Sequence, residues 1–145
     1  MEVKSLQQML KERGEAIIRT AGISMEPLLH AGESTVLIQR KDRPCRKNDV
    51  ALFIRPDGQY VLHRVIGLGK QLRMRGDHQL VCEWVDEECV IGLMVGFHAR
   101  RNSKFCSIRS VRYAAYLLVL PVLRLHLRMR VFGGRVRCKW REMIR

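Results

Sequence analysis

The chain has 145 residues, enough for one domain with a buried core and too few for two. Hydrophobic residues make up 47% of it and charged residues 28%, proportions that exclude an intrinsically disordered chain. The formal net charge of +13 is uneven, because residues 1–99 have a balance of +1 and residues 100–145 a balance of +12. The basicity is therefore a property of the C-terminal segment.

The N-terminal segment has the pattern of a short helix. Apolar residues recur at helical spacing from Val3 to Leu10, and Gly14 follows them. This pattern predicts an amphipathic helix within residues 1–15. A packed end of the domain is the interpretation that we favour over a lid or a partner-binding helix.

The middle of the chain has the pattern of a small sheet. Six segments have the composition of short strands, and a Pro56-Asp57-Gly58 turn predicts a hairpin between the third and the fourth. The segments are residues 16–18, 35–38, 50–54, 60–66, 72–75 and 90–97. Short strands separated by turn signals predict a mainly β domain over residues 16–99, with a coiled or barrel-like antiparallel sheet.

The C-terminal segment, residues 100–145, is predicted to be a basic amphipathic extension that is partly helical. Residues 113–120 are an apolar run about half as long as a membrane span requires. Residues 123–131 alternate apolar and mostly cationic side chains, which favours a strand, whereas the preceding composition favours a helix. Both conformations stay open. Either one suits an anionic membrane surface or a partner protein better than nucleic acid, because no recognition helix or stacking-aromatic pattern is present.

The cysteines indicate a reducing compartment. Their number, five, is odd, and no two form a Cys-x-x-Cys pair, so neither a zinc site nor a complete disulfide framework is predicted. No N-terminal stretch has the order of a secretory signal, and no apolar run reaches the length of a spanning helix. We therefore expect a cytoplasmic protein that needs no cofactor or metal and whose extension allows it to be peripheral on a membrane surface.

Ser24 is the candidate nucleophile. It stands between Gly22, which permits close backbone approach, and Pro27, which fixes the chain after the turn. A serine hydroxyl needs a neighbouring base and donors for the oxyanion that it generates. His63, in the segment of residues 60–66, is the candidate base, because an imidazole accepts a proton near neutral pH with little desolvation.

Five blocks in a fixed order carry a resemblance to a known family. They are Gly22-Ile-Ser-Met-Glu-Pro27, Lys47-Asn-Asp-Val-Ala-Leu-Phe53, Val61-Leu-His-Arg-Val-Ile-Gly67, Arg75-Gly-Asp77 and Val90-Ile-Gly-Leu-Met-Val-Gly96. In these blocks the chain resembles the signal peptidase I superfamily of serine proteases, which includes the self-cleaving SOS-repressor proteases. Position 63 matches the histidine type, found in archaeal and endoplasmic-reticulum signal peptidases. The family's signal peptidases usually carry an N-terminal membrane anchor, and we expect this chain to depart from them by lacking one.

The resemblance implies a serine endopeptidase that cleaves a precursor or leader peptide through an acyl-enzyme, with Ser24 and His63 as its catalytic pair. It also implies that the peptide binds as an added strand, with small side chains beside the cleaved bond. Asp77 resembles the aspartate of the family's Gly-Asp-Asn box and is expected to support the site, either structurally or by orienting His63. His78 stands where the family prefers asparagine. Four rival carboxylates, Glu83, Asp86, Glu87 and Glu88, are interpreted as a solvated acidic loop.

Two other functions stay open. One is a non-catalytic relative that uses the same fold to bind a peptide. The other is a nucleic-acid-associated relative of the self-cleaving repressors, although we expect no DNA-binding domain ahead of the protease-like segment and no self-cleavage bond stands out before it.

Overall fold

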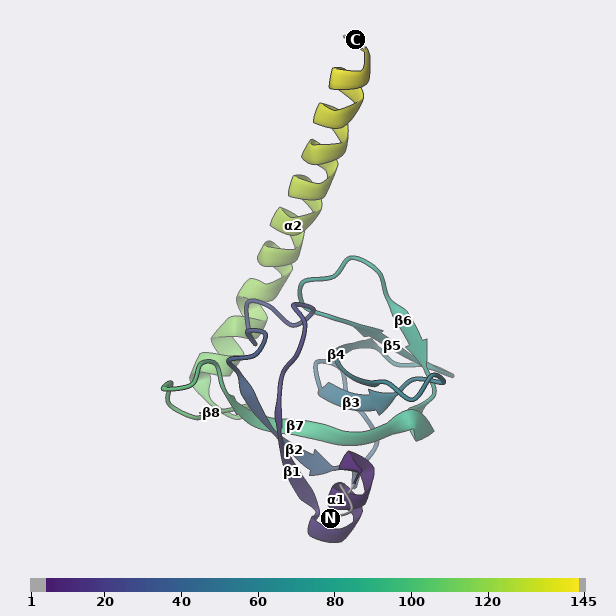
Figure 1. The fold of residues 1–145 in the computed structure, drawn as a ribbon, viewed down its shortest axis with the longest axis vertical. Helices are drawn as coiled ribbons and strands as arrows, with labels where there is room; N and C mark the ends of the chain where they lie inside the picture. The colour runs from purple at the N-terminus through teal and green to yellow at the C-terminus, as the bar shows by residue number, and fades with distance from the viewer. Residues whose placement is uncertain (1–4, 144–145) are drawn as a thin grey trace.

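The computed structural model describes the backbone of residues 5–143 and the side chains of residues 5–133. An eight-stranded antiparallel sheet forms the body, a short helix lies at its N-terminal end, and a long helix leaves it at the C-terminal end (Figure 1). In chain order the elements are α1 (Leu6–Arg13), β1 (Glu15–Arg19), β2 (Thr35–Arg40), β3 (Val50–Ile54), β4 (Tyr60–Gly67), β5 (Leu72–Arg75), β6 (Glu83–Val85), the 3₁₀ turn η1 (Glu87–Cys89), β7 (Val90–His98), β8 (Cys106–Ser107) and α2 (Val111–Met143).

Helix α1 is defined by its two caps. Ser5 accepts a hydrogen bond from the backbone N–H of Gln8, and the Gln8 side chain accepts one from the backbone N–H of Ser5, which forms a capping box. Gly14 ends the helix at φ 78°, a conformation that glycine adopts at little cost. Leu10 packs into the core, so the prediction of a packed amphipathic helix is confirmed for the described part of residues 1–15. Val3 lies outside the described residues.

The sheet is open. Its strand order is β1-β2-β7-β3-β4-β5-β6, with β8 paired to β7, and every pairing is antiparallel. The prediction of a mainly β, antiparallel domain is confirmed, but the barrel-like closure is wrong. The reason lies in β6, which has three residues and, among the strands that the structure describes, pairs only with β5, because the chain then returns through β7 to the middle of the sheet. Strands β1 and β6 are left as the two edges.

The six predicted strands all form. Strands β3 and β5 have the predicted limits, and the other four differ by one or two residues at their ends. The sequence did not predict β6 and β8, which have three and two residues and are too short to display a period-two pattern.

The core has two parts. One cluster joins α1, β1, β2, the segment of residues 25–29 and the first turns of α2. The other lies among β3, β4, β5, β6 and β7, where Phe53, Val65 and Met74 are buried. The larger hydrophobic side chains that stay exposed include many on α2.

Helix α2 includes residues 123–131, for which the sequence left strand and helix open. Tyr113 and Leu120, seven residues apart and therefore on one helical face, are buried against the domain, and this packing favours the helix. The partly helical C-terminal extension is therefore confirmed. Within the described residues, no helix has the length and apolarity of a membrane span.

A buried ion pair ties α2 to the sheet. Arg64 of β4 donates two hydrogen bonds to the Asp77 carboxylate, at 2.8 and 2.7 Å, and both side chains are fully buried. From α2, the Tyr116 hydroxyl and the Arg124 guanidinium also donate to Asp77, at 2.9 and 3.1 Å. Burial lowers the pKa of Arg64, but the hydrogen bonds and the charge of Asp77, together with Tyr113, outweigh that effect and raise it, so the arginine stays charged.

Replacement of Arg64 by methionine, R64M, should destabilise the fold. It leaves the buried Asp77 carboxylate without its bidentate partner, and breaking such a pair costs about 3–5 kcal/mol. Urea unfolding of both variants would measure the loss. The control is R73M, at an exposed position of β5, which should change the free energy of unfolding by less than about 0.5 kcal/mol. Equal losses in the two variants would contradict a special role for the buried pair.

Candidate active site

Ser24 lies in the loop between β1 and β2, and side-chain hydrogen bonds brace this loop. Ser34 is buried, accepts a hydrogen bond from the backbone N–H of His30 at 2.7 Å and donates one to the carbonyl of Ala99 at 2.6 Å. The Thr20 hydroxyl donates to the carbonyl of His30 at 3.0 Å. The loop that contains Ser24 is therefore fixed at its base, although it has no regular secondary structure.

The segment after β5 holds Ser24 from the other side. The backbone N–H of His78 donates to the Ser24 carbonyl at 2.9 Å. A Cβ atom at Gly76 would overlap that same carbonyl, so only glycine lets the two backbones approach this closely. These contacts explain why the sequence has glycine and aspartate at positions 76 and 77. The glycine accommodates the Ser24 loop, and the aspartate binds Arg64.

The His63 side chain projects from β4 into the protein interior. It is 2% exposed, and its ring lies 6.0 Å from the ring of Phe53, centroid to centroid. Burial lowers the pKa of His63 below its ordinary value of 6.5, and this effect exceeds the opposing influence of a nearby carboxylate. The imidazole is consequently neutral at neutral pH, which is the form that accepts a proton.

That carboxylate belongs to Glu83 of β6. Glu83 Oε1 lies 2.9 Å from His63 Nδ1, with an alignment poorer than that of a linear N–H···O bond. Arg55, just after β3, holds the same carboxylate through two hydrogen bonds of 2.7 and 2.8 Å. The hydrogen bonds from Arg55 lower the pKa of Glu83, so the carboxylate is ionised beside the imidazole.

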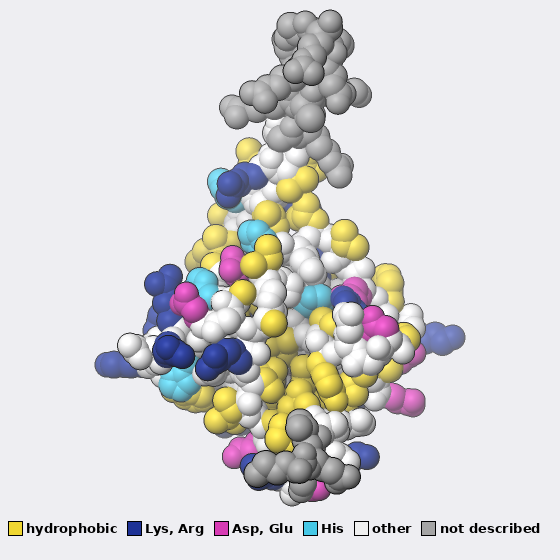
Figure 2. Space-filling model, in the orientation of Figure 1, with side chains coloured by type: hydrophobic (Ala, Val, Ile, Leu, Met, Phe, Trp, Pro, Cys, Tyr) yellow, Lys and Arg dark blue, Asp and Glu magenta, His cyan; other side chains and the backbone are white. Residues whose placement is uncertain are grey.

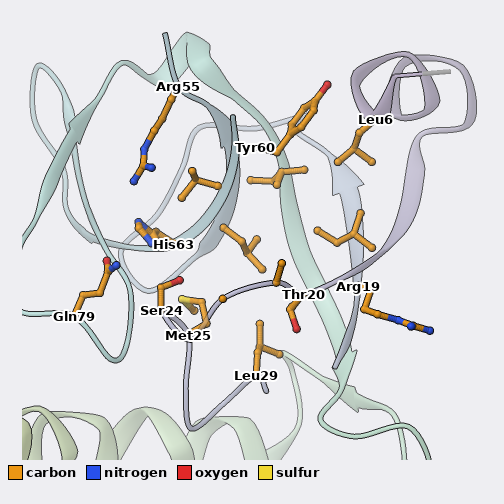
Figure 3. Close-up of a pocket in the computed structure, with 16 residues that line it drawn as sticks. Leu6, Arg19, Thr20, Ser24, Met25, Leu29, Arg55, Tyr60, His63 and Gln79 are labelled. Atoms are coloured by element: carbon orange, nitrogen blue, oxygen red, sulfur yellow. The ribbon is translucent and has the colours of Figure 1, made fainter. Parts of the chain in front are cut away.

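Ser24 and His63 line one pocket, with a volume of about 360 Å³. Figure 3 shows both side chains at this pocket, with the His63 ring above Ser24 and Gln79 beside them. Most of the remaining wall is apolar and comes from α1, β1, β3, β4 and the Ser24 loop itself, including Leu6, Leu52 and Met25. The structure therefore brings together the alcohol and the imidazole that the sequence singled out.

Both polar groups of Ser24 that catalysis would use are available. Among the described residues, neither the Ser24 hydroxyl nor its backbone N–H has a hydrogen-bond partner. The hydroxyl does not bond to His63 in this state, and catalytic hydrogen bonds are often long in unliganded sites. The free N–H is a donor of the kind that stabilises an oxyanion.

The carboxylate beside His63 is that of Glu83, not that of Asp77. Asp77 was expected either to support the site structurally or to orient His63. It accepts hydrogen bonds from Arg64, Tyr116 and Arg124, which are the contacts of the structural role. Glu83 was interpreted as part of a solvated loop, and this is wrong, because it is half-buried in β6 and lies against His63. The only signal for it was a carboxylate beside Trp84 and Val85, a pattern too short to identify a strand.

Other chemistry is not suggested by the described part of the chain. Its described side chains include no group of three or more His, Cys, Asp or Glu able to hold a metal ion. Cys45, Cys82, Cys89 and Cys106 are free thiols, and burial raises the pKa of Cys45 to about 11, which makes it a poor nucleophile. Cys138 lies outside the described side chains.

Comparison of the chain with protein-family models and with curated protein sequences gives no match.

Replacement of Glu83 by glutamine, E83Q, should lower the pKa of His63 further. The negative charge of Glu83 raises that pKa, and Arg55, which lowers it, would lose its neutralising partner. We expect an NMR titration of the His63 ring to have its midpoint below 6.5 in the wild type and lower still in E83Q. Glu87, which pairs with Lys41 instead, provides the control E87Q, in which the midpoint should not move. An upward shift in E83Q would contradict the assigned geometry.

Replacement of Gly76 by alanine, G76A, should displace the Ser24 loop. The added methyl group overlaps backbone, which cannot rotate away, so we expect a loss of about 1–3 kcal/mol in stability and a lower rate of any Ser24-dependent reaction. Gly69 offers a matched control, because a Cβ there meets only ordinary contacts, with Gln71 O at 3.6 Å. Thermal unfolding and reaction rates of G76A and G69A would be compared. Unchanged values in G76A would show that the close approach is dispensable.

Proposed function

We propose that the chain is a serine endopeptidase of the signal peptidase type, in which Ser24 attacks a peptide carbonyl and His63 is the general base. The observation that supports it is the shared pocket, where a partly exposed serine lies beside a buried, neutral imidazole. The five ordered blocks of the sequence and the antiparallel sheet are consistent with this family.

In the proposed mechanism His63 uses its Nε2 atom. The Glu83 carboxylate next to Nδ1 favours the tautomer with the proton on Nδ1, which leaves Nε2 free to take the Ser24 proton. The Ser24 oxygen then bonds to the substrate carbonyl carbon, and the backbone N–H of Ser24 stabilises the oxyanion. His63 gives its proton to the leaving amine as the peptide bond breaks. Water, deprotonated by His63, hydrolyses the acyl-enzyme and restores Ser24.

Two open strand edges beside the pocket would hold the substrate. Strand β1 pairs only with β2 among the described strands, and β5 pairs with the Arg64–Gly67 part of β4, which leaves the first half of β4 without a partner on that side. Residues at the end of β1 and at the start of β4 both line the pocket. An extended peptide can add to these edges through main-chain hydrogen bonds, and the apolar wall favours small apolar side chains beside the cleaved bond.

The same edges support a second candidate, a peptide-binding protein without catalysis. It requires the strand edges and the apolar pocket but neither the serine nor the imidazole. The two candidates therefore differ in one property, the dependence of any peptide turnover on Ser24 and His63.

Replacement of Ser24 by alanine, S24A, should abolish cleavage and leave the fold intact. A peptide library incubated with the full chain would be analysed by mass spectrometry for new termini. We expect cleavage to fall by at least about 10³-fold in S24A and by a similar factor in H63A, since members of such a pair act as one unit. The variant H126A changes an exposed histidine of α2 and should cleave as the wild type does.

Cleavage that persists in S24A would exclude the proposed nucleophile. Peptides that the wild type and S24A retain equally, with no new termini in either, would favour the binding protein. Thermal unfolding of each variant separates a lost reaction from a lost fold.

A further inference from the structure

Helix α2 has two different faces. One face packs on the domain through Tyr113 and Leu120, which are buried, and through Tyr116 and Leu117, which are partly buried. The same face carries Arg124, which reaches Asp77. These residues secure the first part of the helix, and the remainder extends away from the sheet (Figure 1).

The opposite face carries a stripe of exposed hydrophobic side chains. Its members recur three, four or seven residues apart, so they lie on one side of the helix, and each is more than half exposed. The apolar stripe consists of Val111, Leu118, Val122, Leu125, Met129 and Phe132. It runs for about 30 Å at the helical rise per residue. Hydrophobic side chains are visible along this part of the molecule in Figure 2, with Lys and Arg among them.

Arginines border the apolar stripe on both sides. Successive residues of a helix are rotated by about 100°, so Arg128 and Arg130 flank Met129 on opposite sides. Both are exposed, as is Arg112 near the start of the stripe. No acidic residue occurs in the sequence between Glu88 and Glu142. The stripe is therefore an apolar surface whose charged neighbours on the helix are all cationic.

We propose that the apolar stripe of α2 binds an anionic phospholipid surface. The helix would lie along the surface with the stripe at the boundary between headgroups and acyl chains, and its arginines would contact lipid phosphates. Because the packed face points the opposite way, the β domain stands on the water side. Tyr116 and Arg124 keep their bonds to Asp77 in this arrangement.

Charge distinguishes this occupant from others. A second copy of the helix, paired along the stripe, would bring arginines against arginines with no acidic side chain on the helix to neutralise them. Nucleic acid would neutralise the arginines but leave six hydrophobic side chains in water. An anionic lipid surface satisfies both features, since it buries the stripe and pairs the border.

Flotation with vesicles tests the proposal on the full chain. We expect partition onto phosphatidylcholine vesicles that contain phosphatidylglycerol, and little onto pure phosphatidylcholine. The variant L125E/M129E should lower partition at least about ten-fold, because it places two carboxylates in the apolar stripe. Its control, V81E, changes an exposed hydrophobic residue outside α2 and should partition as the wild type does.

The arginines are tested separately. The variant R128Q/R130Q should lower partition by about five-fold for each arginine and weaken its dependence on salt. This variant leaves the apolar stripe intact. If thermal unfolding shows that L125E/M129E does not fold, R128Q/R130Q still tests binding to anionic lipid.

Three results would overturn the proposal. The first is equal partition onto neutral and anionic vesicles, and the second is partition of L125E/M129E equal to that of the wild type. The third is a wild-type chain that does not partition but is a dimer by size-exclusion chromatography with light scattering, while L125E/M129E is a monomer. The third result would assign the stripe to a second copy. None of these outcomes depends on peptidase activity, because no residue of the apolar stripe lines the Ser24 pocket.

Discussion

The buried ion pair between Arg64 and Asp77 determines how the parts of this structure meet. Arg64 belongs to β4, Asp77 to the segment after β5, and α2 adds Tyr116 and Arg124 to the same carboxylate. Such a pair is costly to desolvate, but once it is buried, loss of either partner leaves an uncompensated charge. Three chain segments are therefore fixed relative to one another by one carboxylate. Burial, and then the charge of Asp77, raise the pKa of Tyr116, so its hydroxyl keeps the proton that it donates.

The pair also helps to position Ser24 and His63, although neither Arg64 nor Asp77 lines their pocket. His63 immediately precedes Arg64, so alternation along β4 directs the two side chains to opposite faces. The segment that carries Asp77 also holds the Ser24 loop, through the N–H of His78 and the close approach at Gly76. Positions far apart in the sequence are thus placed by a shared support. The pKa of His63 is set mainly by burial, which favours the neutral form, and by Glu83, which opposes it.

The sequence predicted those features that local patterns encode. Strand β3 is an apolar run and β5 alternates apolar and cationic residues, so the limits of both strands were predictable. For α1 the helical spacing and Gly14 predicted the helix and its end, but not its start. Strand β6 has three residues, and for that reason Glu83 could not be assigned to a strand or placed against His63. Sheet closure depends on which distant edges meet, which no local pattern encodes. The alternation of residues 123–131 favours a strand and the preceding composition a helix, and only the packing of Tyr113 and Leu120 decides for the helix.

The two faces of α2 allow one helix to support the candidate site and, as we propose, to contact lipid. The residues that bind Asp77 lie opposite the apolar stripe, and Leu125 and Met129 have no described contact with the Arg64–Asp77 group. Energetic effects at separated positions without shared partners usually add independently. Changes of the exposed face should therefore alter surface binding while the packed face keeps its bonds to Asp77. Changes at Tyr116 or Arg124 act differently, because the Asp77 that they bind lies in the same segment as Gly76 and His78, which hold Ser24. The helix is consequently a structural part of the candidate site, whatever its exposed face binds.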